Sequence, residues 1–386
     1  MGQSMQTIAG WVLGAEGWRF GLLHFAQSIL RFEADPARPS PGLADPPAQA
    51  GETLVLPGFI DLHVHGGGGA DVMDGGDAVQ TMARLHARHG TTALLATPMT
   101  APYADIERAF EGIAACMQTP DGAGATVLGA HLEGPFISAQ RLGAQPDHCV
   151  SGDLEAVQRW SAIAPIRVVT LAPEVEQNLA LVGALVKLGM RVQMGHTTAS
   201  YEQSCAALAA GLSGFTHVFN AMGAMHQRSP GALGAALAHA EYAELITDLI
   251  TVHPGAVRVG LRCIPKLYAV TDATAAAGMP DGEYSLGRQR VHKCLGAVRL
   301  ADGTLAGSAL TTDQSLRNLV SLPMSIAPGL AAPLALPGAI PGPGAQGKPG
   351  YRKRRRSGAA GSGLARAGRA CGRRQSLMPE CKRRLA

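Results

Sequence analysis

The sequence lacks the features of membrane and secreted proteins. No apolar run reaches the ~18 residues that a membrane-spanning helix needs. The amino end has no lysine or arginine before Arg19, unlike a secretory signal, and Gln6 stands where a myristoylation signal has serine or threonine. The seven cysteines are scattered singly with no CxxC pair, which indicates reduced thiols and not a disulfide framework. We therefore expect a cytoplasmic protein.

Charge is distributed unevenly along the 386 residues. Of the 33 lysines and arginines, 13 lie from Pro323 onward, where Glu380 is the single acid. The residues before Pro323 hold 20 basic and 28 acidic side chains, the balance of a mildly acidic globular enzyme. Hydrophobic residues make up 46% of the sequence, which excludes disorder over its whole length.

Residues 323–386 form a basic tail rich in Pro, Gly and Arg, with neither a helical nor a strand period. We expect this tail to be disordered, or to result from a reading-frame change near Leu322, since a GC-rich gene read out of frame yields such a composition. The alternative is that the RKRRR run binds nucleic-acid phosphates, although nucleic acid is not the expected partner.

The preceding residues divide into two predicted parts. Residues 1–53 contain short apolar runs broken by Gly and Pro, which predict a few strands of a small β-domain. Residues 54–322 contain eight β-like runs separated by Ala-rich, helical stretches, and successive runs begin about 20 to 40 residues apart. The runs start at or near Phe59, Thr91, Ala125, Ile166, Arg191, Gly214, Glu244 and Lys266.

Eight such units predict an α/β fold of the (β/α)8 TIM-barrel type, because strands buried on both faces are continuously apolar. The alternative is a doubly wound open sheet. GGGG at 66–69 follows the first predicted strand, but no G-x-G-x-x-G opens a helix there, and this argues against the alternative.

Polar residues recur at the carboxyl ends of these strands, where a barrel builds its active site. Any one of them alone would be interpreted as a hydrogen-bonded or helix-capping residue. Six such residues at the same end of the barrel instead favour a site for a divalent metal, zinc or another first-row ion. The six are His63, His65, Glu133, His196, His217 and Asp272. His131 would lie one layer deeper than Glu133, so we interpret it as structural.

These residue types suit the hydrolysis of an amide. A metal held by Glu133, His196 and His217 with one open position would make hydroxide available at neutral pH. Asp272, from the opposite strand, could take the proton of the water and pass it to the leaving amine.

Several motifs together resemble the N-acetylglucosamine-6-phosphate deacetylase family of the amidohydrolase superfamily, from about Leu54 to Leu322. They are PGFIDLHVHG, HLEGPF, GHTTASY, THVFNAM, VTDATAAAG and GTLAGSALT. Hydantoinases and dihydroorotases would instead carry a carbamylated lysine at the end of the fourth strand, which here reads LAPE.

The resemblance implies the activity and a role for each matching position. The implied reaction converts N-acetyl-D-glucosamine 6-phosphate to D-glucosamine 6-phosphate and acetate, in amino-sugar catabolism, by a homodimer acting on this small sugar phosphate. Glu133, His196 and His217 match metal ligands, His63 and His65 match a second-metal pair, and Asp272 matches the catalytic acid/base. The implied cofactor is one or two divalent ions per subunit, zinc first, with iron, cobalt or manganese as alternatives. The positions matching substrate contacts are Ala144, Asn220, Ala221, Arg228, Thr251, Leu305, Ala306 and Gly307.

The sequence departs from the family pattern at three places. The family's Asp-Gly-x-His motif reads Asp248-Leu249-Ile250-Thr251, and only a loop shift would let His253 replace the missing histidine. Gln145 stands where the family has histidine in Gly-Ala-His. The tail replaces the segment that completes the small β-domain, which we therefore expect to be incomplete. These departures leave two alternatives, an amidohydrolase acting on another N-acyl substrate and an inactive member that binds without turnover.

Overall fold

The computed structural model describes residues 5–14, 16–26, 28–41, 51–120 and 122–322. They form two compact units that divide between Gly58 and Phe59, a few residues beyond the boundary expected from the sequence. The predicted tail at 323–386 lies outside the described residues.

The first unit contains a four-stranded sheet in the order β3-β2-β1-β4. Strands β1 and β2 form an antiparallel hairpin, and β4 pairs with β1 in parallel, so Leu54 and Val55 belong to this sheet. Arg38 stacks over Phe20 at 3.9 Å and pairs with Glu52 at 2.5 Å. The strands are β1 (Gln6–Gly14), β2 (Gly17–Phe25), β3 (Ile29–Ala34) and β4 (Leu54–Val55).

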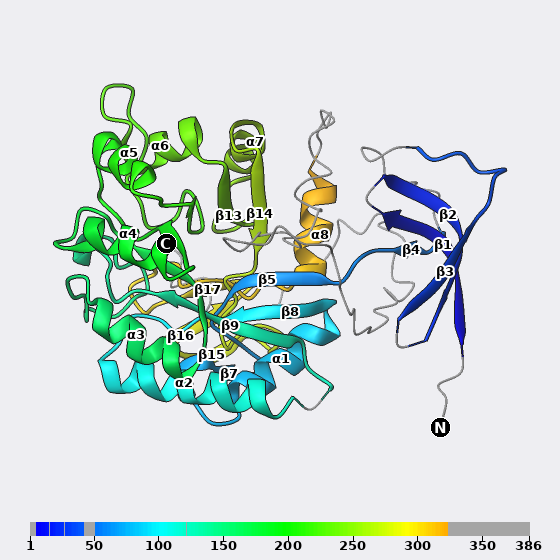
Figure 1. Cartoon of the computed structure of the whole chain (residues 1–386), viewed down its shortest axis with the longest axis horizontal. Helices are drawn as coiled ribbons and strands as arrows, with labels where there is room; N and C mark the ends of the chain where they lie inside the picture. Colours follow the sequence, from blue (N-terminus) through cyan, green and yellow to red (C-terminus); the bar gives the residue numbers. More distant parts are fainter. Residues whose placement is uncertain (1–4, 15, 27, 42–50, 121, 323–386) are drawn as a thin grey trace, which may run out of the picture. The chain divides into compact units, whose positions relative to one another are not determined.

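The second unit is built on eight parallel strands, one in each of the eight predicted runs, in the order β14-β13-β12-β11-β10-β9-β8-β5. Their inner residues are almost entirely buried, as expected where helices cover a closed sheet (Figure 1). The strands are β5 (Phe59–Val64), β8 (Thr91–Ala96), β9 (Thr126–Glu133), β10 (Ile166–Leu171), β11 (Arg191–Met194), β12 (Gly214–Phe215), β13 (Tyr242–Ile246) and β14 (Lys266–Val270).

The first and last strands meet and close the barrel. The Asp272 N–H donates to the His63 carbonyl at 2.9 Å, just beyond the end of β14. One layer below, the buried Asp61 carboxylate accepts from the Thr271 hydroxyl at 2.6 Å and from the Thr271 N–H at 3.2 Å. The predicted (β/α)8 barrel is therefore confirmed, and the open-sheet alternative is excluded.

Eight α-helices, in the described part of the chain, connect and cover the strands. Several begin at side-chain caps; Ser200, for example, forms a capping box with Gln203. None of these helices combines the length and apolar character that crossing a bilayer requires. The helices are α1 (Ala78–Arg88), α2 (Tyr103–Gln118), α3 (Leu154–Ile163), α4 (Asn178–Lys187), α5 (Tyr201–Ala209), α6 (Gly231–His239), α7 (Pro254–Cys263) and α8 (Thr312–Ser321).

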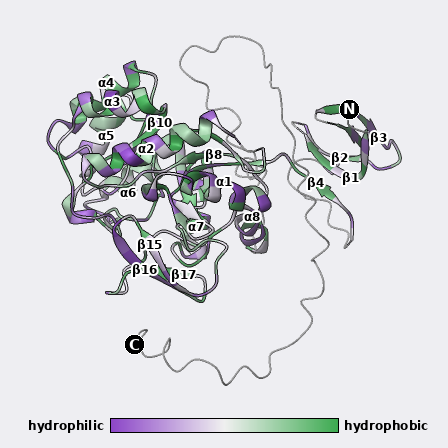
Figure 2. Ribbon diagram, turned by 90° about the horizontal axis from the view of Figure 1, so that it is seen from below, coloured by the Kyte–Doolittle hydropathy of each residue, from purple (hydrophilic) through white to green (hydrophobic). Residues whose placement is uncertain are grey.

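Short elements are inserted beside the carboxyl ends of the strands. A three-stranded sheet lies between β14 and α8 in the sequence. Its middle strand, β16, carries hydrophilic residues (Figure 2). The inserted elements are β6 (Gly66–Gly67), β7 (Ala70–Asp71), η1 (Val72–Asp74), η2 (Ala139–Arg141), β15 (Gly282–Leu286), β16 (Gln289–Cys294) and β17 (Ala297–Arg299).

A buried histidine on α1 makes the stability of the barrel dependent on pH. His86 Nε2 donates to the Gly66 carbonyl at 3.0 Å, and burial lowers the pKa of His86 from 6.5 to about 4. Below pH 6.5 the His86 side chain is protonated in the unfolded chain but stays neutral in the folded chain. The free energy of unfolding therefore falls as the pH drops from about 6.5 to about 4.

His86→Gln keeps an N–H donor but does not titrate. Over this pH range we expect the free energy of unfolding to fall by up to roughly 3 kcal/mol less in His86→Gln than in the wild type. Urea unfolding at pH 7 and pH 4 measures the difference. The exposed His226→Gln serves as the control and should behave like the wild type. Equal acid destabilisation of His86→Gln and the wild type would contradict the assignment.

Candidate metal centre and active site

Six polar side chains lie at the carboxyl ends of five barrel strands, as predicted. His63 lies in β5 and His65 directly after it, and Glu133 is the last residue of β9. His196, His217 and Asp272 each follow the end of their strand by two residues, after β11, β12 and β14. None of the six is more than 7% exposed.

Glu133, His196 and His217 converge on one point. Glu133 Oε1 lies 2.9 Å from His217 Nε2 and 3.2 Å from His196 Nε2, and the two Nε2 atoms are 3.1 Å apart. Ligands about 2.1 Å from a tetrahedral zinc ion lie roughly 3.4 Å from one another. The observed spacing therefore fits one divalent ion with these three ligands.

The histidine tautomers agree with metal binding. His196 Nδ1 lies 2.8 Å from the Arg141 carbonyl, and His65 Nδ1 lies 2.9 Å from the Thr97 carbonyl. Because a carbonyl oxygen only accepts, each Nδ1 carries the proton and donates it. In the neutral ring the lone pair is therefore on Nε2, which faces the site, and this is the form that binds a metal.

A second group shares Glu133 with the first. His63 Nε2 and His65 Nε2 lie 3.1 Å apart, and His65 Nε2 lies 3.2 Å from Glu133 Oε2. Glu133 thus turns one oxygen to His196 and His217 and the other to His65. His63, His65 and Glu133 could therefore hold a second divalent ion, and Glu133 would belong to both groups.

The carboxylates outweigh the effect of burial on the neighbouring imidazoles. Burial alone would lower the pKa of His63, but Glu133, Glu244 and Asp272 raise this pKa well above its usual value. Such a concentration of buried negative charge attracts a cation, and a metal ion meets that demand.

Asp272 is placed to exchange protons at the centre. Its Oδ1 lies 3.2 Å from His65 Nε2 and 3.6 Å from His63 Nε2. Burial alone would raise the pKa of Asp272, but these imidazoles hold it below its usual value, so the carboxylate is ionised at neutral pH. His196, His217 and Asp272 have φ values of 47°, 31° and 49°, a strained conformation that is typical of functional residues.

The centre opens into a cavity of about 220 Å³. Asn220 lines it, and the buried Nδ2 of Asn220 has no hydrogen-bond partner in the described part of the chain. Among the described residues, those lining the cavity include no lysine or arginine. Arg228 is exposed and Ala306 is fully buried, and neither of them lines the cavity. The other lining residues that the sequence analysis named are Ala144, Ala221, Thr251, Leu305 and Gly307.

Gln145, which replaces the histidine expected from the family resemblance, contacts Glu133, a candidate metal ligand. Its Nε2 donates to Glu133 Oε2 at 2.5 Å, and its Oε1 accepts from the Thr100 N–H at 2.8 Å. The buried Gln145 therefore fixes the orientation of the Glu133 carboxylate. In the sequence this position was notable only as a departure from the family pattern, and its contact with Glu133 was not predicted.

The other departure shapes the loop after β13. The Thr251 hydroxyl donates to Asp248 Oδ1 at 2.7 Å, and Leu249 has a φ of 62°, a conformation that favours glycine. His253 does not line the cavity; its Nδ1 accepts from the Gly255 N–H at the start of α7. His253 thus does not replace the missing histidine.

Sequence analysis missed Glu244 on β13. This fully buried carboxylate lies 2.8 Å from His63 Nδ1. A charged residue inside an otherwise apolar strand was the one available signal. His131, interpreted as structural, has both ring nitrogens engaged, by the Leu62 carbonyl at 2.9 Å and the Thr170 hydroxyl at 2.7 Å.

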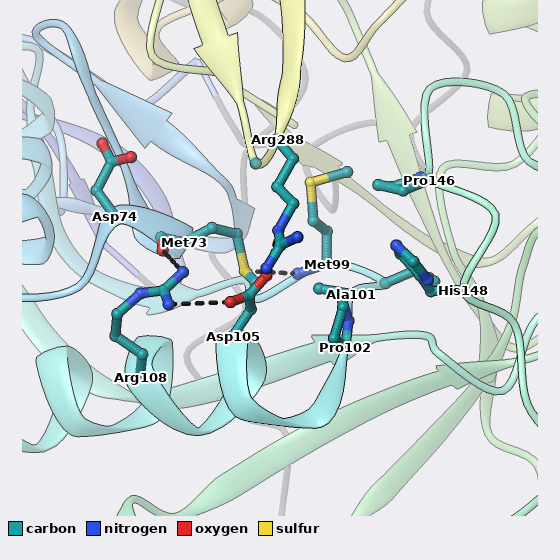
Figure 3. Close-up of a pocket in the computed structure, with 12 residues that line it drawn as sticks. Met73, Asp74, Met99, Ala101, Pro102, Asp105, Arg108, Pro146, His148 and Arg288 are labelled. Atoms are coloured by element: carbon teal, nitrogen blue, oxygen red, sulfur yellow. Dashed lines mark hydrogen bonds and ion pairs between the residues drawn. The ribbon is translucent and has the colours of Figure 1, made fainter.

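A second cavity, of about 250 Å³, lies beside the first and shares Met99 with it. Arg108 and Arg288 both point toward Asp105 (Figure 3). Arg108 donates to Asp105 Oδ1 at 2.9 Å, and Arg288 donates to Oδ2 at 2.6 Å. Both guanidinium groups are thus already paired with a carboxylate.

The fold and the centre define a hydrolase of the metal-dependent amidohydrolase type. Residues 54–283 match the amidohydrolase family, and the chain belongs to it. The chain is 42% identical over 273 residues to the N-acetylglucosamine-6-phosphate deacetylase of Lysinibacillus sphaericus, covering 69% of this chain and 70% of the relative. It is also 42% identical over 276 residues to the N-acetylgalactosamine-6-phosphate deacetylase of Escherichia coli O157:H7, covering 70% and 73%.

Among solved structures, the chain is similar to the N-acetyl-D-glucosamine-6-phosphate deacetylase of Mycobacterium smegmatis, solved as an aspartate-to-alanine mutant in complex with N-acetyl-D-glucosamine 6-phosphate. The TM-score is 0.75 at 34% identity, over 86% of this chain and 87% of that chain. The resemblance to the N-acetylglucosamine-6-phosphate deacetylases found in the sequence is therefore confirmed.

We expect Glu133→Gln to weaken metal binding at both groups by at least about tenfold, because both groups share this carboxylate. Metal analysis of the purified protein after dialysis measures the loss. Glu202→Gln, at an exposed position on α5, is the matched control and should keep the wild-type metal content. Unchanged metal content in Glu133→Gln would contradict the assignment of the centre.

Proposed function

We propose that this protein hydrolyses the acetamide of N-acetyl-D-glucosamine 6-phosphate to D-glucosamine 6-phosphate and acetate, as a step of amino-sugar catabolism in the cytoplasm. The observation that carries the proposal is the convergence of Glu133, His196 and His217 beside Asp272 in a cavity of about 220 Å³. The relatives named as deacetylases support the choice of substrate.

The imidazole and carboxylate donors suit zinc, while iron, cobalt and manganese take similar ligands. Glu133, His196 and His217 would hold the first ion, and His63 and His65 would complete the site of a second. A bound ion supplies Lewis acidity, which polarises the acetamide carbonyl and lowers the pKa of water.

Asp272 performs the proton transfers of the reaction. Its ionised carboxylate accepts a proton from the attacking water as the new C–O bond forms. The same carboxyl group then donates that proton to the amide nitrogen as the C–N bond breaks. Asp272 returns to its ionised form. The acetic acid loses its own proton, which the amine takes up, so the products at neutral pH are acetate and the protonated amine.

The chain's other residues would position the sugar. The free N–H groups of the Asn220 amide suit a hydroxyl or carbonyl oxygen of the substrate. Ala144, Ala221, Leu305 and Gly307 form part of the cavity wall, and Ala306 is buried. Thr251 presents its hydroxyl where the family has histidine.

The phosphate needs a cation, and the described residues of the cavity wall do not supply one. Arg228 has the planar fork that grips a phosphate, and it is exposed outside the cavity. We therefore propose that the enzyme is a homodimer in which Arg228 binds the substrate phosphate across the subunit boundary.

N-acetyl-D-galactosamine 6-phosphate is the second candidate substrate, since a relative with that activity is as similar as the first. The two sugars differ in the direction of one hydroxyl group, so the same metal centre and Asp272 would serve both. The choice between them depends on contacts in the cavity wall.

We expect acetate release from at least one of the two phosphorylated sugars, and loss of this activity after chelation. Asp272→Asn should lower kcat by about 10²–10⁴-fold, because the amide cannot carry the proton. Its metal content should stay within about twofold of the wild type. The exposed Asp77→Asn is the control. Acetate release that survives both chelation and Asp272→Asn would refute this mechanism.

We expect Arg228→Ala to raise KM for the phosphorylated sugar by about tenfold or more, through loss of a charge-assisted contact worth roughly 1.5–3 kcal/mol. The slow hydrolysis of the unphosphorylated sugar should not change. Steady-state kinetics on both sugars measures this, with the exposed Arg262→Ala on α7 as the control. An equal change for both sugars would count against a phosphate contact.

A further inference from the structure

We propose that Glu244 is a positioning residue for the second metal ion. It holds the proton of His63 on Nδ1 and so presents the Nε2 lone pair to that ion. The inference deepens the proposed function, because it concerns the metal centre on which the reaction depends.

The contact between the two side chains is short and fully buried. Glu244 Oε2 lies 2.8 Å from His63 Nδ1, and both residues are 0% exposed. The opposite ring nitrogen, Nε2, lies 3.1 Å from His65 Nε2 and 3.6 Å from Glu133 Oε1. A carboxylate oxygen accepts a hydrogen bond from Nδ1–H, so when a metal displaces a proton from the ring, the proton leaves from Nε2 and its lone pair faces the metal.

Other buried groups hold the Glu244 carboxylate in place. The Tyr268 hydroxyl donates to its Oε1 at 3.3 Å, and the His217 N–H donates to its Oε2 at 3.3 Å. Gln193 Nε2 in turn donates to the Tyr268 hydroxyl at 2.7 Å. Glu244 therefore cannot rotate away from His63 without breaking several buried hydrogen bonds.

The same buried layer continues to His131 on the other side of the barrel. The Thr216 hydroxyl donates to Gln193 Oε1 at 3.0 Å and lies 2.6 Å from the Thr170 hydroxyl. His131 Nε2 lies 2.7 Å from the Thr170 hydroxyl. This chain of hydrogen bonds crosses the barrel beneath the metal centre and makes the layer rigid.

His63, His131 and Glu244 lie close enough together to suggest a further ion site, but hydrogen bonds already engage their atoms. His131 Nδ1 lies 2.9 Å from the Leu62 carbonyl and 3.8 Å from Glu244 Oε1. Since the carbonyl can only accept, His131 Nδ1 carries a proton and cannot bind a metal. The group therefore serves as a support for the centre above it.

Replacement of Glu244 by glutamine keeps the shape of the side chain but removes the carboxylate that accepts from His63 Nδ1. If the amide nitrogen faces His63, Nδ1 has to accept, and the proton moves to Nε2, where it blocks the metal. If the amide oxygen faces His63, the tautomer is kept but the charge that strengthens the ligand is lost. In both orientations the second ion binds more weakly.

The experiment titrates metal-free protein with Zn²⁺ in a calorimeter and compares the wild type with Glu244→Gln, His63→Gln and the double variant. We expect two ions in the wild type, and second-ion affinity about 10–100-fold lower in Glu244→Gln, with the first ion unchanged. In the double variant, zinc binding should equal that of His63→Gln, because Glu244 acts through His63. Glu241→Gln, exposed and one residue before β13, is the matched control.

Three results would overturn the proposal: a wild type that binds one ion only, two ions of wild-type affinity in Glu244→Gln, or equal weakening of both ions. If Glu244→Gln does not fold, Tyr268→Phe replaces it. That variant removes the hydroxyl donor to Glu244, and unchanged second-ion affinity in it would refute the inference. The readout is zinc binding and not activity. A protein without deacetylase activity would therefore disprove the proposed function, but the inference about Glu244 could still be tested.

Discussion

One buried carboxylate, Glu133, connects the two halves of the metal centre. One of its oxygens lies within 3.2 Å of both His196 and His217, and the other lies 3.2 Å from His65. Burial makes an unpaired carboxylate costly, so these imidazoles, Gln145 and a bound cation have to satisfy it together. The left-handed backbone at His196 and His217 follows from the same demand, since their imidazoles have to reach this group.

The barrel closes where the chemistry takes place. His63 and Asp272 come from the first and last strands, and the Asp272 N–H donates to the His63 carbonyl at 2.9 Å. The link between Asp61 and Thr271 lies one layer below and ties the same two strands together. Closure of the barrel therefore sets the distance between Asp272, the proposed proton carrier, and the histidines proposed to bind a second metal, which makes fold stability and site geometry interdependent.

The departures from the family lie in the residues around the metal ligands. Gln145 contacts Glu133, while Thr251 contacts Asp248 in the loop after β13. The centre keeps its ligands, but the groups that would recognise the sugar and its phosphate have changed. The metal chemistry therefore depends on the unchanged ligands, whereas the choice between the two epimeric sugars depends on contacts in the cavity wall.

The eight strands and the six polar residues at their ends could be predicted from the sequence, because apolar runs and strand-end residues are local signals. The contacts of Gln145 and Glu244 could not be predicted. Glu244 lies 181 residues from His63 along the chain, and no spacing rule links two positions on different barrel strands. The exposure of Arg228, outside the cavity, was equally beyond the sequence. Local patterns determined which residues reach the end of the barrel, and only the packing of distant strands decided which atoms touch there, because side-chain hydrogen bonds depend on three-dimensional register.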